Sequence, residues 1–218
     1  MENSRTKYIL LYVLAALPLV VTLFAFNKLP DRIPMHWDVN GNVNGYGDKI
    51  PFAFILPLIP LVTPAFMSLM AKMDPQRANY TVFRGSYYIM QLLLVLIFVS
   101  LNFITISVAL GYEIVKVDTF VKLIIGLLIT VIGNLMPKFK HNYFVGIKTP
   151  WTLASEEVWF KTHRIGGMLW FFGGILMMAL AFVPGRISAV LYIAIVLATS
   201  LVSLIYSYIE FNRAKKLK

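Results

Sequence analysis

The sequence predicts an all-α, polytopic membrane protein, a bundle of six transmembrane helices with a short extracellular cap and a cytoplasmic interfacial helix. Hydrophobic residues make up 59% of the 218 residues and charged residues only 14%, whereas a soluble domain has roughly 45–50% apolar and about 25% charged residues. Such a composition excludes an ordinary soluble enzyme, and so many large apolar residues exclude a disordered chain. The basic excess, 20 Lys and Arg against 10 Asp and Glu, favours a membrane orientation signal over nucleic-acid binding.

Six apolar stretches are long enough to cross a bilayer. A spanning helix needs roughly 20 mostly apolar residues, and lipid offers the backbone no hydrogen-bond partners, so these stretches are expected to be helices rather than open strands. The predicted spans are Tyr8–Phe26, Pro51–Met70, Tyr87–Leu110, Thr119–Leu135, Ile165–Val183 and Ile187–Ile209.

The distribution of basic residues predicts which side of the membrane each loop faces. With the N-terminus inside, the inner loops and ends carry 14 Lys and Arg and the outer loops carry 6. Inner segments of membrane proteins are enriched in these residues, so both termini are expected in the cytoplasm. Loop 27–50 then lies outside and loop 136–164 lies inside.

Two units are expected along the chain. Residues 1–86 form an N-terminal two-helix unit that carries the outer loop, and residues 87–218 form a four-helix unit that carries the inner loop. Pro184-Gly185 is a turn signal, which predicts an antiparallel hairpin of spans five and six. Four glycines of span five predict close helix packing rather than a ligand site. They are Gly166, Gly167, Gly173 and Gly174.

The outer loop is expected to fold into a small ordered cap. Pro30 and Pro34 favour extended backbone, and apolar residues alternate with other residues over 33–38, which predicts a short strand. Asn40-Gly41 and Asn44-Gly45 are turn signals, because Asn and Gly accept positive φ angles. The cap is therefore predicted to be a hairpin.

The inner loop is expected to contain an amphipathic helix that runs to His163. Thr149-Pro150 is a helix start with Thr as the N-cap and Pro in the first turn. Thr152 and Ser155 are alternative caps, since two glutamates follow Ser155 directly. Glu157 and Lys161 lie four residues apart and can form an ion pair on one helix face.

No catalytic, metal or cofactor site is predicted. The chain has no H-E-x-x-H pair and no Gly-rich phosphate loop, and the acidic residues and His36 of the outer loop lack the spacing of known metal ligands. No span is expected to carry a buried carboxylate, which argues against proton-coupled transport. An alternative from another class is a membrane enzyme or small-molecule transporter that uses loop 134–164. Its candidate residues are Asn134, Asn142, Glu157, His163 and Arg164.

The inner loop resembles the signature of the SdpI-type immunity proteins. The matching residues are Gly133-Asn134, Pro137, Asn142, Gly146, Thr149-Pro150-Trp151-Thr152-Leu153, Glu157, Trp159, Thr162-His163-Arg164 and Gly167. The outer loop resembles the small domain of unknown function that often precedes this signature, at Leu29-Pro30, Ile33-Pro34, His36-Trp37, Gly41 and Asp48-Lys49. Lys148 stands where the family pattern has an arginine, which keeps the charge but loses the planar, two-pronged donor.

The resemblance implies a bacterial plasma-membrane protein that protects a cell against a secreted antimicrobial peptide toxin. It further implies signalling, in which a transcriptional repressor is captured at the membrane. The partners would be the lipid bilayer, the toxin outside and the repressor inside, without direct nucleic-acid binding. It assigns partner binding inside to Asn134, Pro137, Asn142, Gly146, Lys148, Thr149, Pro150, Trp151, Thr152, Leu153, Glu157, Trp159, His163 and Arg164. The site residues of the extracellular loop are Pro30, Ile33, Pro34, His36, Trp37 and Gly41.

Overall fold

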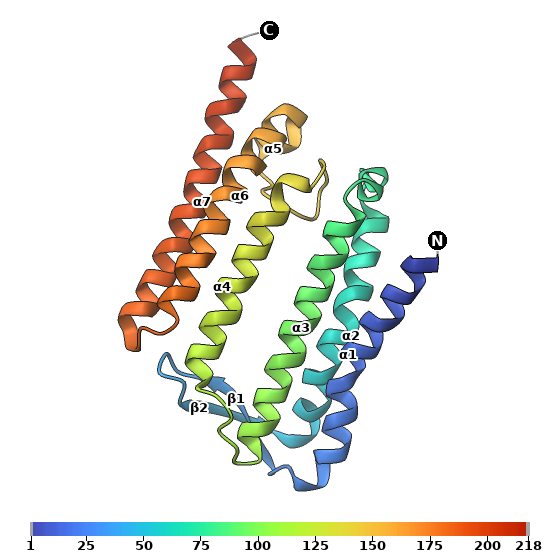
Figure 1. The fold of residues 1–218 in the computed structure, drawn as a ribbon, viewed down its shortest axis with the longest axis vertical. Coiled ribbons are helices and arrows are strands. Elements are labelled where there is room, and N and C mark those ends of the chain that lie inside the picture. The colour runs from blue at the N-terminus through green and yellow to red at the C-terminus, as the bar shows by residue number, and fades with distance from the viewer. Residues whose placement is uncertain (1, 217–218) are drawn as a thin grey trace. The chain divides into compact units, whose positions relative to one another are not determined.

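The computed structural model describes residues 2–216, which contain seven α helices and one two-stranded sheet. In chain order the elements are α1 (Glu2–Ala25), the 3-10 turn η1 (Phe26–Lys28), β1 (Arg32–Trp37), β2 (Val43–Asp48), α2 (Lys49–Met73), η2 (Arg77–Thr81), α3 (Arg84–Ala109), α4 (Val117–Leu135), η3 (Met136–Lys138), α5 (Pro150–Ala154), α6 (Glu156–Leu180) and α7 (Gly185–Lys216). Figure 1 shows this order along the ribbon.

Six of these helices, all except α5, are long and apolar enough to cross a membrane within the described residues. They coincide with the six predicted spans, so the all-α polytopic class is confirmed. Large apolar side chains also lie on the outer surfaces of the helices, for example Phe24, which is 84% exposed. The main difference is the start of the fifth span, which was predicted at Ile165, whereas α6 begins at Glu156. Ser155 caps the helix there, and its polar first turns continue directly into the apolar part.

The chain folds as two compact units. The first comprises residues 1–68 and 91–121, and the second comprises residues 69–90 and 122–218. The division of the sequence at residues 86 and 87 stays a prediction.

In the first unit, the outer loop forms the predicted β hairpin. The strands β1 and β2 are antiparallel, with Arg32 opposite Asp48. The carboxylate of Asp38 accepts hydrogen bonds from the backbone N–H groups of Asn40 and Asn42, both at 2.9 Å. Gly41 completes the turn with a φ of 86°, a conformation that side chains with a Cβ disfavour.

The second predicted turn of this loop is wrong. Asn44 and Gly45 both lie within β2, and Gly45 pairs with His36 at an irregularity of the register. Two closely spaced Asn-Gly pairs compete for one turn, and the side chain of Asp38 stabilises the first by accepting its N–H groups. Asn44 instead uses its side-chain oxygen to bind Nδ1 of His36 at 2.5 Å.

A small apolar core holds the base of the hairpin in the first unit. Leu29 and Ile33 are buried together with Ala53 of α2 and Ile106 of α3. The ammonium group of Lys49 donates to the carbonyl of Leu29 at 2.9 Å and lies 4.5 Å from the ring centroid of Phe26. The hairpin is therefore fixed to helix ends rather than attached only by its two chain connections.

In the second unit, glycines bring α4 and α6 into backbone contact. A Cβ on Gly133 would lie 2.7 Å from the carbonyl oxygen of Gly167, and a Cβ on Gly174 would lie 2.7 Å from that of Gly126. These pairs are antiparallel and seven residues apart on each helix, so the packing role predicted for the α6 glycines is confirmed. The α6–α7 hairpin is also confirmed, with Gly185 at a φ of 77° (Figure 1).

Gly133→Ala is expected to destabilise the protein, because the added methyl group meets backbone atoms of α6 that cannot move aside. Overpacking of this kind costs about 1–3 kcal/mol. Thermal unfolding of the purified protein in detergent measures the loss. Gly85→Ala is the matched control: a Cβ there meets nothing within 4 Å, so the variant should unfold at or above the wild-type temperature. Equal stability of the two variants would contradict the close contact.

Gly41→Ala is expected to cost more stability than Gly111→Ala. Both glycines have positive φ angles, 86° and 82°, so either substitution strains the backbone by about 1–2 kcal/mol. At Gly41 the new Cβ would also lie 3.0 Å from the backbone nitrogen of Asp118, whereas Gly111 has open space. Hydrogen exchange of the amides of residues 38–42 should increase in Gly41→Ala and stay unchanged in Gly111→Ala; similar exchange in both would refute the contact.

Candidate functional site

The candidate site lies in the second unit and is formed by the segment from η3 to the first turns of α6. Trp159 of α6 is fully buried at its centre. The indole N–H of Trp159 donates to the carbonyl of Phe139 at 2.8 Å, which binds the start of the loop to α6. The ring of Trp159 stacks on the imidazole of His163, with ring centroids 3.9 Å apart.

Asn142 organises the loop that follows Phe139. Its side-chain oxygen accepts the backbone N–H groups of Phe144 and Val145 at 2.9 and 2.7 Å, and its amide nitrogen donates to the carbonyls of Lys140 and Val145. The side chain is completely buried. The backbone groups of a loop without regular structure form few hydrogen bonds with one another. Here the amide side chain of Asn142 supplies the missing hydrogen-bond partners.

Two histidines flank Trp159, and their partners define their tautomers. Nδ1 of His163 faces the carbonyl of Trp159 at 2.8 Å, and Nε2 accepts the backbone N–H of Ile147 at 3.0 Å. His163 is therefore neutral with its proton on Nδ1, because a carbonyl accepts and an N–H donates. His141 donates from Nε2 to the carbonyl of Leu153 at 3.1 Å, and its buried Nδ1 has no partner.

Gly146 is required by this arrangement. It has a φ of 111°, and a Cβ at this position would collide with Nε2 of His163. The glycine therefore allows the loop to approach the imidazole closely enough for the hydrogen bond from Ile147.

Of the three predicted caps, Thr149 is the N-cap of α5 and Ser155 is the N-cap of α6, whereas Thr152 is not an N-cap and lies in the first turn of α5. Thr149 and Thr152 form a reciprocal capping box: the hydroxyl of Thr152 accepts the N–H of Thr149 at 2.8 Å, and that of Thr149 accepts the N–H of Thr152 at 3.1 Å. Thr149 also hydrogen-bonds Ser207 of α7 at 3.1 Å. Ser155 caps α6. The sequence left open which residue caps a single helix, and the structure has two consecutive helices, each with its own cap.

Asp74 belongs to the site and was missed by the sequence analysis. It follows α2 and is only 1% exposed. Its carboxylate accepts the hydroxyl of Tyr80 at 2.8 Å, and the backbone N–H groups of Gln76 and Tyr143 at 2.7 and 2.9 Å. Burial and this carboxylate raise the pKa of Tyr80 above its usual range. A signal was present, since Asp74 is the only acidic residue between positions 49 and 112.

Glu210 was missed as well, and it corrects the expectation that no span carries a buried carboxylate. It lies in α7 and is 4% exposed. Lys161 and Arg213 pair with it at 3.1 and 2.9 Å. Lys161 also forms the predicted pair with Glu157, at 2.9 Å. Glu210 was missed because the predicted sixth span ends one residue earlier, at Ile209.

The signature residues fall into three classes by exposure. Those that shape the loop are buried, namely Asn142, Thr149, Thr152, Trp159 and His163. Six others are exposed, namely Asn134, Pro137, Lys148, Pro150, Glu157 and Arg164, and three are half-buried, namely Gly146, Trp151 and Leu153. Trp151 packs edge-on against Tyr208 of α7, at 5.1 Å between ring centroids.

The outer residues divide in the same way. Ile33 and Pro34 are buried, Trp37 and Gly41 are half-buried, and Pro30 and His36 are exposed.

Hydrogen bonds, first of all from the backbone of Asn42, lower the pKa of Asp38. Within residues 2–216, no three acidic, histidine or cysteine side chains gather as metal ligands.

Comparison with known proteins finds a match for each of these two regions. Residues 138–207 match the model of the SdpI/YfhL protein family, and residues 13–61 match a domain of unknown function, DUF1648. The chain is 26% identical to Immunity protein SdpI of Bacillus subtilis (strain 168) over 207 residues, which cover 95% of this chain and 97% of that relative. No solved structure matches the chain. The resemblance found from the two loops is thereby confirmed.

Asn142→Ala is expected to destabilise the inner loop. The substitution leaves the part-buried N–H groups of Phe144 and Val145 without their acceptor, and an unsatisfied buried group of this kind costs about 1–3 kcal/mol. Thermal unfolding in detergent and protease sensitivity of the loop measure the effect. Asn134→Ala is the matched control, because Asn134 is exposed and such surface changes stay within about 0.5 kcal/mol. A stable Asn142→Ala variant would contradict the role given to this side chain.

Proposed function

We propose that this chain is a member of the SdpI family and an immunity protein of the bacterial plasma membrane, which protects the cell that carries it against a secreted antimicrobial peptide toxin. The observation that carries the proposal is the extent of the similarity to Immunity protein SdpI, which includes 95% of this chain. Both the hairpin and the inner loop are thus part of the shared architecture.

In the proposed orientation both termini are cytoplasmic. Six spans return the chain to the side on which it began, and the basic residues are concentrated in the segments placed inside. We assign toxin contact to the unit of residues 1–86, whose hairpin faces the outside, and partner contact to residues 87–218.

The hairpin suits contact with an amphipathic peptide at the headgroup layer. It exposes the apolar side chains Val39 and Tyr46, which are 45% and 53% accessible, next to the polar groups of the turn. Its base is fixed by the buried core around Ile33, so little ordering is needed on binding. Capture of the peptide there keeps it from permeabilising the bilayer.

The inner loop suits an acidic partner surface, such as that of a captured transcriptional repressor. Lys148 and Arg164 are exposed on a loop held by Asn142. His163 is fully buried and Lys161 pairs with two glutamates, so neither is assigned to this partner surface. Signalling requires that peptide binding favours the arrangement that binds the repressor more tightly. The repressor, not this chain, would contact nucleic acid.

The proposal contains no catalytic step. Asn142 and His163 are two of the residues considered for an enzyme or transporter. Their polar side-chain atoms form hydrogen bonds with the backbone of the loop and of α6. A binding role needs only the exposed residues on top of this framework, which favours recognition over chemistry.

Deletion of the gene is expected to make the cells sensitive to the cognate peptide toxin, and re-expression restores resistance. Tyr46→Ala should lower protection, because it removes an exposed contact of the hairpin. Arg164→Ala should keep protection and weaken repressor capture, by about 1–3 kcal/mol for a charged hydrogen bond. Survival curves and co-purification of the repressor from gently solubilised membranes measure the two effects separately.

Immunoblots must show equal membrane levels of each variant, and Lys28→Ala, which changes an exposed residue outside the hairpin, serves as the surface control. Unchanged survival of the deletion strain across candidate peptide toxins would overturn the immunity proposal. Normal repressor capture by Arg164→Ala would overturn only the inner assignment.

A further inference from the structure

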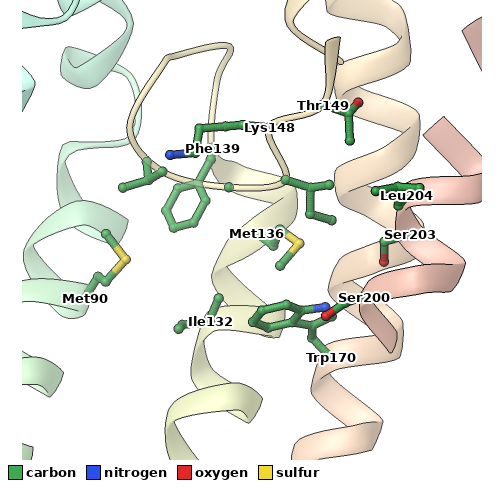
Figure 2. Close-up of a pocket in the computed structure, with 13 residues that line it drawn as sticks. Met90, Ile132, Met136, Phe139, Lys148, Thr149, Trp170, Ser200, Ser203 and Leu204 are labelled. Carbon is green, nitrogen blue, oxygen red and sulfur yellow. The ribbon is translucent and has the colours of Figure 1, made fainter. Parts of the chain in front are cut away.

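A pocket of about 400 Å³ lies in the second unit beneath the inner loop. Ligand pockets of proteins range over about 300–1,000 Å³, so this volume admits a small molecule or one lipid chain. Figure 2 shows the loop that carries Lys148 and Thr149 above the pocket and Trp170 and Ile132 below it. Neither the capping interactions nor the proposed partner surface accounts for this space.

The walls of the pocket are mostly apolar. Met90, Ile132, Met136 and Leu204 contribute to the lining, together with the ring of Phe139. Leu204 is 45% exposed on α7, so the pocket reaches the lipid-facing surface of this helix. A molecule could therefore enter sideways from the bilayer.

Two polar features stand out against these walls. The indole N–H of Trp170 is buried and has no hydrogen-bond partner, which costs about 1–3 kcal/mol for such a group. Ser200 and Ser203 also line the pocket, and the hydroxyl of Ser203 donates to the carbonyl of Thr199. An acceptor oxygen from a bound molecule would satisfy Trp170.

A cation lies at the other end of the pocket. Lys148 is exposed, and its ammonium group donates to the carbonyl of Phe144 at 3.0 Å. An ammonium group has three donors, so further donors of Lys148 can contact an anion. The predicted cytoplasmic position of this loop places the cation at the headgroup level of the inner leaflet.

We propose that the pocket binds an anionic phospholipid of the inner leaflet. Its phosphate contacts Lys148, an ester carbonyl accepts the N–H of Trp170, and one acyl chain lies along Met90, Ile132 and Leu204. Basic pockets between membrane helices are known to recognise anionic headgroups. A phospholipid combines an anion, acceptor oxygens and an apolar chain, which are the groups that Lys148, the N–H of Trp170 and the apolar walls can bind. This inference does not depend on the immunity proposal.

The test is native mass spectrometry of the full chain, purified from nanodiscs that contain equal amounts of phosphatidylglycerol and phosphatidylcholine. The wild type should retain phosphatidylglycerol. Lys148→Ala should reduce the preference over phosphatidylcholine about fivefold, the value of one lysine near an anionic surface at about 1 kcal/mol. Trp170→Phe keeps an aromatic side chain, removes the indole N–H and should weaken retention of both lipids. Ser200→Leu fills the pocket and should remove the retained lipid.

Matched controls change the same residue types away from the pocket, namely Lys138→Ala and Ser100→Leu, and should behave as the wild type. A single symmetric peak in size-exclusion chromatography shows that each variant is folded. Retention of both lipids in equal amounts, retention of free fatty acid instead, or unchanged retention in Ser200→Leu would each overturn the proposal. Because no toxin is present, the result is separate from any loss of immunity.

Discussion

The hydrogen bonds of the buried Asn142 side chain are the interaction on which the inner half of this protein depends. The loop between η3 and α5 has little regular structure, yet it packs against helices that cross the membrane, where unsatisfied backbone groups are costly. One amide side chain satisfies two N–H groups and two carbonyls of that loop. With the backbone so fixed, Trp159 and His163 can bind it from α6, and the exposed residues of the signature stand on a defined framework.

Two buried carboxylates, those of Asp74 and Glu210, are stabilised in different ways next to the inner loop. Asp74 receives three hydrogen bonds from N–H and O–H donors, whereas Glu210 is paired with two cations. Both solutions offset the cost of removing a carboxylate from water. Asp74 connects the α2–α3 loop to Tyr143, and Glu210 connects α7 to α6 through Lys161. The two carboxylates thus join elements that are far apart along the chain, which explains why a membrane protein with few acidic residues keeps these two buried.

The exposure of the signature residues gives the motif a physical interpretation. Trp159, Thr152 and Gly146 each make a contact that shapes the loop: Trp159 donates to Phe139, Thr152 completes the capping box with Thr149, and Gly146 leaves room for His163. Lys148 and Arg164 are exposed and do not form the buried contacts of the loop. Lysine at position 148, where the family pattern has arginine, fits this division, because no buried fork of hydrogen bonds depends on this side chain.

Local sequence determined the elements of this protein. Six long apolar runs produced six helices, Asn40-Gly41 produced the hairpin turn, and Thr149 and Ser155 produced consecutive helix caps, since each of these features depends on residues within one or two turns of the backbone. Tertiary structure decided which polar residues are buried and what they contact. Thr149 meets Ser207 across 58 positions, Asp74 meets Tyr143 across 69, and Gly133 of α4 meets Gly167 of α6. Such pairs depend on long-range packing and on burial in a medium without water, and no local propensity encodes either of them.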